Sequence, residues 1–178
     1  QGPQASSASQ SSSMRRRIAA SGSGPWAARR LVSTFLTLVV PGMAQVTAGK
    51  GIQRSAMIYS KEPVDVDGAG PRTVQLVFRD HPEWKRSAYL VLQAGDFRCP
   101  GGCKVKLVAD GAAAKSMAAW RPDTDEAIAM FITDHKALWK LVRKTRAVAI
   151  EFPVKGGGTR TAVFETGGLN AEHMPGWD

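Results

Sequence analysis

Residues 147–166 read AVAIEFPVKGGGTRTAVFET. Two runs of residues that favour strands, 147–154 and 159–166, flank Gly156-Gly157-Gly158, a pattern typical of an antiparallel hairpin. Gly167-Gly168 ends the second run, and Leu169 then returns one apolar side chain to the core. This stretch therefore predicts that the chain ends its folded part as paired β-strands.

A short amphipathic helix is predicted immediately before this hairpin, at 135–146. Asp134 is placed to cap its first turn, and Leu138, Leu141 and Val142 form an apolar stripe at helical spacing. Cations in the last turn suit the helix dipole. The preceding run, 126–132, fits either a buried strand or a helical turn by periodicity, and we favour a strand.

Further strands are predicted upstream, separated by segments rich in glycine and proline. Asp110-Gly111 is a turn signal between two of them. Several strands, one helix and a final hairpin predict an α+β domain, mostly antiparallel β, arranged as a sheet or a sandwich. The helix then covers one face of the sheet or closes one end. The upstream strands are expected at 56–59, 73–78, 87–92, 104–107 and 115–120.

An export signal is predicted at 14–44. Met14-Arg15-Arg16-Arg17 supplies positive charge, 31–40 supplies an apolar run, and Pro41-Gly42-Met43-Ala44 ends it with small residues. The apolar run is about half of the roughly 20 residues that a membrane-spanning helix needs, so we expect a cleaved leader and no span after its removal. Val46-Thr47-Ala48 offers a second cleavage site. The expected location is the periplasm or the outside medium.

The rest of the chain divides by composition. Residues 1–13 are uncharged and almost without apolar side chains, so we expect a disordered leader whose native origin the sequence does not decide. Residues 45–55 are small and polar and are expected to be flexible. A single globular β-rich domain is expected at 56–170, followed by a tail at 171–178.

The net charge of +9 is concentrated at the start of the chain. Residues 1–44 hold five of the 24 Lys and Arg residues and none of the 15 Asp and Glu residues. Residues 45–178 therefore carry +4, which is ordinary for a soluble domain. We accordingly expect no nucleic-acid partner.

The two cysteines, Cys99 and Cys103, flank Pro100-Gly101-Gly102. In an exported protein such a pair predicts a disulfide, and the intervening residues have turn chemistry. Two alternatives stay open, a redox-active pair and a metal site. The first usually has two intervening residues instead of three, and the second lacks nearby ligands, so we expect no metal or cofactor.

Candidate chemistry is sparse, and we expect no catalytic residues. His81, beside Asp80 and Glu83, is the best single acid–base candidate, although an exposed loop histidine is the simpler interpretation. Asp123, Asp125 and Glu126 are adjacent on one polar segment and are interpreted as turn or cap residues. The tryptophans at 84, 120 and 177 are too far apart in the sequence to predict a stacking platform.

A cationic face is predicted on the helix, with a tryptophan at its edge. Such a face is usually just solvated, but it could also bind an acidic protein, anionic lipid head groups or lipopolysaccharide phosphates by peripheral contact. The residues of this possible binding face are Lys136, Trp139, Lys140, Arg143 and Lys144.

The region 97–169 resembles small exported bacterial envelope proteins of the invasion-associated locus B type, and related accessory proteins of type VI secretion. The resemblance is carried by two cysteines before a basic–apolar strand, an apolar run followed by a short helix, and two later motifs. These residues are Cys99, Cys103, Ala129-Met130-Phe131-Ile132, Asp134, Leu138, Leu141, Val148-Ala149-Ile150-Glu151, Phe164 and Gly167-Gly168-Leu169. This chain departs from the pattern in having two cysteines where those proteins usually have more. The resemblance implies an exported β-rich domain without known enzymatic chemistry, and it transfers no binding residues.

The sequence therefore predicts an exported, non-enzymatic binding or accessory domain of the bacterial cell envelope that works through protein or envelope contacts. Two alternatives remain at this point. One is a small envelope hydrolase or enzyme inhibitor, with its chemistry at 80–84 or 123–126. The other is a domain that binds anionic surfaces, lipid or lipopolysaccharide, through its basic helix.

Overall fold

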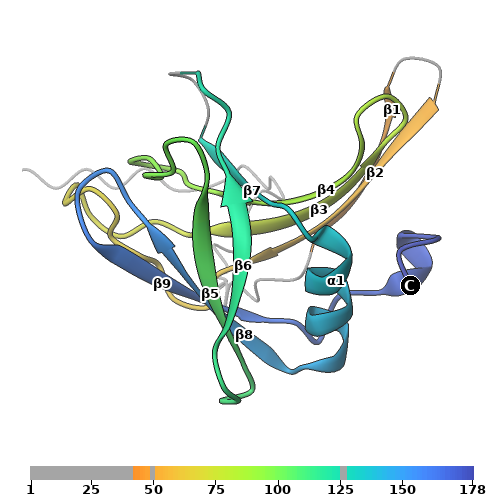
Figure 1. Cartoon of the computed structure of the whole chain (residues 1–178). Coiled ribbons are helices and arrows are strands. Elements are labelled where there is room, and N and C mark those ends of the chain that lie inside the picture. The colour runs from red at the N-terminus through yellow and green to blue at the C-terminus, as the bar shows by residue number, and fades with distance from the viewer. Residues whose placement is uncertain (1–41, 49–50, 125–127) are drawn as a thin grey trace, which may run out of the picture. The chain divides into compact units, whose positions relative to one another are not determined.

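The computed structural model describes residues 42–48, 51–124 and 128–178 (Figure 1). These residues form an antiparallel sheet of nine strands with one α-helix and one short 3₁₀ helix, as the α+β prediction requires. In chain order the elements are β1 (Gly42–Ala48), β2 (Gly51–Tyr59), β3 (Gln75–His81), β4 (Lys85–Val91), β5 (Cys103–Ala109), β6 (Lys115–Trp120), β7 (Ala129–Ile132), α1 (His135–Lys144), β8 (Ala147–Pro153), β9 (Thr159–Glu165) and η1 (Ala171–His173).

The strands are ordered β1-β2-β3-β4-β7-β6-β5-β8-β9, and every neighbouring pair is antiparallel. The sheet also curls back on itself. Ser60, directly after β2, forms a bridge with Phe164 of β9, and the Lys61 amide donates to the Val163 carbonyl oxygen at 2.7 Å. Strands β2 to β9 therefore close into a barrel-like sheet around one core, and β1 extends the free part of the β2 edge.

Alternation along the strands explains which side chains fill this core. In β8, Val148, Ile150 and Phe152 are fully buried, and the residues between them are only partly buried. Side chains on a strand point alternately to opposite faces, so a strand with this pattern supplies one apolar face to the core. Each large apolar side chain buried in this way contributes about 1.5–3 kcal/mol.

The helix α1 begins as predicted at Asp134, whose Oδ1 accepts a hydrogen bond from the Ala137 amide at 2.9 Å. It ends at Lys144, two residues before the predicted end, because Thr145 already has the extended backbone that leads into β8. The helix connects β7 to β8 in the chain and contacts β4. The helix buries Leu138, Trp139 and Val142 against the core of the sheet.

The prediction that segment 45–55 is flexible is corrected by the structure. Residues 42–48 and 51–57 pair as the hairpin of β1 and β2, from Gly42 opposite Met57 to Ala48 opposite Gly51. Backbone hydrogen bonds between strands do not require apolar side chains, so the small, polar composition of this segment was a poor guide. The preference for a strand at 126–132 is confirmed for β7, while residues 125–127 lie outside the described residues.

The predicted leader at 14–44 lies outside the described residues except for its last three positions, which belong to β1. Residues 1–13 also lie outside them. The leader therefore stays a prediction. Both predicted cleavage sites, after Ala44 and after Ala48, coincide with β1, the first within the strand and the second at its end.

The predicted tail at 171–178 is wrong, because this segment belongs to the core. Met174 and Trp177 are almost completely buried, and the Trp177 ring lies 5.8 Å from that of Phe78 and 5.4 Å from that of Trp139. A single turn of 3₁₀ helix has no sequence periodicity to reveal it. The folded domain thus extends beyond the predicted range 56–170 at both ends.

Candidate functional site

Three aromatic side chains from distant parts of the sequence lie side by side on the sheet. Tyr89 of β4 is directly opposite Phe131 of β7, and Phe131 is directly opposite Trp120 of β6. The ring centroids of Tyr89 and Phe131 are 5.0 Å apart, and those of Phe131 and Trp120 are 4.6 Å apart at an interplanar angle of 15°. We call these three residues the aromatic row.

The aromatic row lies on the face of the sheet opposite the core. Leu90, Met130 and Ala119, the neighbours of the row in their strands, are all buried in the core, so alternation turns the row outward. Trp120 is 46% exposed. A large aromatic side chain that is held in place by stacking and still open to solvent is a feature of binding surfaces.

Trp120 also lines an open cleft of about 940 Å³, a volume within the range of ligand sites. The pairing of Cys103 with Ala119 brings Gly102 opposite Trp120, on the side away from Phe131. Because glycine has no side chain, this side of Trp120 stays open. We call this space the Trp120 cleft. It is lined by Phe97, Arg98, Cys99, Pro100, Gly101, Gly102, Trp120, Arg121, Pro122, Asp123, Thr124 and Lys155.

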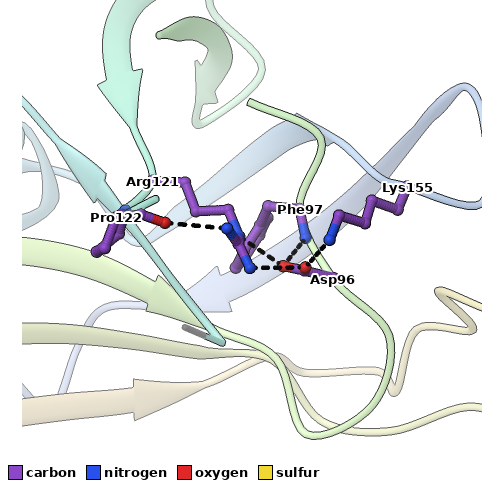
Figure 2. Close-up of polar contacts among 5 residues, drawn as sticks. All are labelled: Asp96, Phe97, Arg121, Pro122 and Lys155. Carbon is purple, nitrogen blue, oxygen red and sulfur yellow. Dashed lines mark hydrogen bonds and ion pairs between the residues drawn. The ribbon is translucent and has the colours of Figure 1, made fainter. Parts of the chain in front are cut away.

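One wall of the cleft is held by an ion network around Asp96 (Figure 2). Arg121 donates to both carboxylate oxygens of Asp96, each at 2.8 Å, and the Lys155 Nζ lies 2.7 Å from Oδ2. The Phe97 amide donates to the same carboxylate at 2.7 Å, and Arg121 also donates to the Pro122 carbonyl oxygen. The network ties together three segments: the loop after β4, the end of β6 and the loop after β8.

The protonation of Asp96 follows from this network. Partial burial alone would raise the pKa of the Asp96 carboxyl, but the hydrogen bonds from Lys155, Arg121 and the Phe97 amide outweigh it and hold the pKa below its usual range. Asp96 is therefore ionised at neutral pH. The oxygens of this carboxylate already accept hydrogen bonds from Arg121 and Lys155, so Asp96 has a structural role.

The cleft lining also contains Cys99 of the predicted disulfide, which the structure confirms. The Cα atoms of Cys99 and Cys103 are 5.1 Å apart and the sulfurs are at bonding distance. Gly101 and Gly102 both have positive φ, 64° and 104°, which only glycine adopts without strain. The Cys99 Sγ is buried in the core, so the crosslink fixes the turn that leaves Trp120 open.

Cations flank the aromatic row, exposed at one end and partly buried at the other. Arg98 lines the Trp120 cleft, and Lys104 follows Gly102 at a spacing of two in the chain, which places it on the outward face near Trp120. At the other end of the row, the guanidinium of Arg79 lies 5.3 Å from the centroids of both Tyr89 and Trp84. The outward face thus presents aromatic rings between positive charges.

His81 does not occupy an exposed loop. It is the last residue of β3 and only 6% exposed, and its Nδ1 accepts hydrogen bonds from the amides of Glu83 and Trp84 at 3.1 and 3.2 Å. Its ring stacks on Trp84 with centroids 4.1 Å apart. This geometry closes the β3–β4 turn, where Lys85 has a φ of 59°, so it favours a structural role over acid–base chemistry.

The cationic helix face is only partly as predicted. Lys136, Lys140, Arg143 and Lys144 are exposed, but Trp139 is fully buried, so its expected position at the edge of this face is wrong. The Trp139 ring packs edge-on against Phe78 with centroids 4.9 Å apart. The helical stripe that faces the core therefore includes this tryptophan in addition to the aliphatic residues.

The aromatic row was not predicted from the sequence. The tryptophans at 84, 120 and 177 do not form a set, because Trp177 is in the core and Trp84 stacks on His81. Trp120 stacks on Phe131, which in turn contacts Tyr89, and both were predicted only as ordinary strand residues. The sequence did contain one signal for the row, because each aromatic residue directly follows a buried apolar residue in its strand, and alternation then turns the aromatic side chain outward.

The described part of the chain contains no cluster of three or more His, Cys, Asp or Glu side chains suited to a metal ion. Among the residues described, no helix has the length and apolar character needed to cross a bilayer.

Fold and site together define a small antiparallel β-domain with a disulfide-braced cleft beside an outward aromatic row. Comparisons with protein-family models, curated proteins and solved structures found no match to this chain.

Proposed function

We propose that this protein is an exported, non-enzymatic binding or accessory domain of the bacterial cell envelope that holds its partner at the Trp120 cleft. The observation that carries the proposal is Trp120 itself. It is stacked on Phe131 and about half exposed, and it borders an open cleft of ligand size. A rigid aromatic side chain gives a large contact area with little loss of conformational entropy on binding.

At the Asp96 network, binding is favoured over hydrolysis because the charged groups are already paired with one another. Asp96 is engaged by Arg121 and Lys155, and Arg121 is further engaged by the Pro122 carbonyl oxygen. A general acid or base needs a proton that it can exchange with the substrate. Because Asp96, Arg121 and Lys155 are paired with one another, they form a rigid wall of the cleft that a ligand can contact.

Export to the periplasm or the outside medium is supported by two features. One is the predicted leader at 14–44. The other is the Cys99–Cys103 disulfide, because such bonds persist in oxidising compartments and are rare in the bacterial cytosol. The partner is then a protein or another component of the envelope, consistent with what the resemblance to locus B-type proteins implies.

The proposal is tested by comparing three tagged full-length chains expressed in a bacterial host. Wild type, Trp120→Ala and Trp84→Ala are recovered from the periplasmic and medium fractions, and the envelope components that they retain are quantified. Trp84 is the matched control because it is an exposed tryptophan, in the turn between β3 and β4, that does not line the cleft. We expect Trp120→Ala alone to lose the retained components.

Equal retention by wild type and Trp120→Ala contradicts a binding role for the cleft. Recovery of the protein only from the cytosol contradicts export. Turnover of an ester, peptide, phosphoester or glycan by the purified wild type supports the hydrolase alternative instead, provided that it is lost in a His81→Ala variant that still folds by circular dichroism.

The anionic-surface alternative has one observation in its favour, the four exposed cations of α1. It predicts salt-sensitive sedimentation with anionic vesicles that is lost when Lys140 and Arg143 are both changed to glutamate. Sedimentation that depends on Trp120 and is unaffected by these charge reversals favours the cleft.

A further inference from the structure

The two faces of the Trp120 ring have different surroundings. Phe131 stacks on the side of β7, with the ring centroids 4.6 Å apart. On the side of β5 lie Gly101 and Gly102 and the open cleft. A Cβ added at Gly101 would meet no atom within 4 Å, and one added at Gly102 only the Ala119 carbonyl oxygen at 3.7 Å. Stacking on Phe131 therefore holds the Trp120 ring in place, and the opposite face of the ring is free to contact a flat, ring-shaped group.

We propose that the Trp120 cleft binds an acidic glycan, a carbohydrate polymer that carries carboxylate or phosphate groups. This inference rests on the proposed function, a binding domain acting at the same cleft. A sugar ring stacks on the free face of Trp120, and the acidic groups of neighbouring sugars pair with Arg98 and Lys104. The apolar C–H face of a sugar ring carries positive partial charge, which the negative face of an aromatic ring attracts.

The charges around the cleft match such a ligand. Arg98 and Lys104 are exposed and, within the part of the chain that the structure describes, form no ion pair. The next lysine along β5, Lys106, differs because it pairs with Glu151 at 3.1 Å. The Asp96 charge is already compensated by Arg121 and Lys155, which leaves that network with one positive charge in excess. The cleft thus offers a few separated cations.

The same features favour a glycan over single-stranded nucleic acid. A nucleic-acid groove stacks several successive bases and follows the backbone with a continuous series of cations. Here one ring face is free, and the carboxylate of Asp123 lines the cleft beside the cations. A strand with a charge on every phosphate favours such a continuous series, whereas this cleft holds a few separated cations and an acidic residue.

The test uses the full chain and four probes: polygalacturonate, its methyl ester, dextran and a single-stranded oligodeoxythymidine. The methyl ester keeps the rings of polygalacturonate and removes their charge. Dissociation constants are measured by titration calorimetry at low and moderate salt. We expect polygalacturonate to bind most tightly, and the methyl ester and dextran to bind at least several-fold more weakly.

The variants separate stacking from charge. Trp120→Ala is expected to weaken polygalacturonate binding about tenfold. Arg98→Glu and Lys104→Glu are expected to weaken it less and to flatten its dependence on salt. Trp84→Ala and Lys140→Glu are the matched controls, an exposed tryptophan and an exposed lysine outside the cleft, and both should bind as wild type does.

Three outcomes overturn the inference. They are no binding of polygalacturonate, binding that Trp120→Ala leaves unchanged, and tighter Trp120-dependent binding of the oligodeoxythymidine, which points to nucleic acid. If Trp120→Ala loses envelope components while polygalacturonate does not bind, the acidic-glycan inference fails and the proposed function stands. If neither the retention of envelope components nor the binding of polygalacturonate depends on Trp120, both the proposed function and the acidic-glycan inference fail.

Discussion

At the level of single residues, Asp96 shows how one carboxylate positions a site without belonging to its contact surface. Its side chain is 19% exposed and that of Arg121 only 10%, so the pair is shielded from water far more than a surface ion pair. Removing the charge leaves Arg121 without its partner in a partly buried position. Asp96→Asn is therefore expected to lower the free energy of unfolding at neutral pH by about 1–3 kcal/mol.

The pH dependence of this loss follows from the lowered pKa of Asp96. A carboxyl whose pKa is lower in the folded state stabilises the fold fully above its unfolded pKa of about 4, and that contribution is lost as the pH falls through the folded value. Denaturant titrations of wild type and Asp96→Asn should thus differ at pH 7 and converge in strong acid. A difference that stays constant from pH 7 to pH 2 contradicts the assigned network.

At the level of elements, the C-terminal segment stabilises the fold. Trp177 is 2% exposed and contacts the rings of Phe78 and Trp139. Trp177→Ala is expected to lower the free energy of unfolding by about 3–5 kcal/mol, a large part of the total for a small domain. Unfolding is followed by circular dichroism, because the substitution removes a fluorophore. The exposed neighbour His173→Ala is the control, and its effect should be below about 0.5 kcal/mol.

The elements differ in how well the sequence predicts them. The hairpin of β8 and β9, the cap at Asp134 and the turn at Asp110-Gly111 depend on neighbouring residues, and the structure confirms all three. The position of the C-terminal segment depends on its burial against residues distant in the sequence, so local sequence patterns predicted a tail. The hairpin of β1 and β2 was missed for a different reason, since its pairing is made by the backbone and its apolar residues Val46 and Ile52 are exposed.

At the level of the whole molecule, the candidate site exists only because of the strand order. β7 is inserted between β4 and β6, and this insertion alone puts Phe131 between Tyr89 and Trp120. Pairing β6 with β7 and β7 with β4 requires connections that no turn signal specifies. The disulfide turn was predictable from Cys-Pro-Gly-Gly-Cys, but its function as the open side of a cleft was not, because it depends on what lies opposite Gly102.

The closure of the sheet predicts how the folded domain responds when a leader is removed. Among the strands that the structure describes, β1 pairs only with β2, whereas Ser60 and Phe164 join β2 to β9 independently of β1. Cleavage after Ala44 keeps the last four residues of β1, and cleavage after Ala48 removes the whole strand. Both cuts leave the barrel-like sheet of β2 to β9 intact.

Chains that begin at residue 45 and at residue 49 should therefore both fold, with Tm values within about 5 °C of each other. The shorter chain is expected to aggregate more readily, because the edge of β2 next to the exposed Ile52 then has unpaired backbone groups. Thermal unfolding by circular dichroism gives the Tm, and light scattering gives the association. Ile52→Lys in the shorter chain should suppress the association without lowering the Tm. Failure of the chain from residue 49 to fold contradicts the independence of the closure from β1.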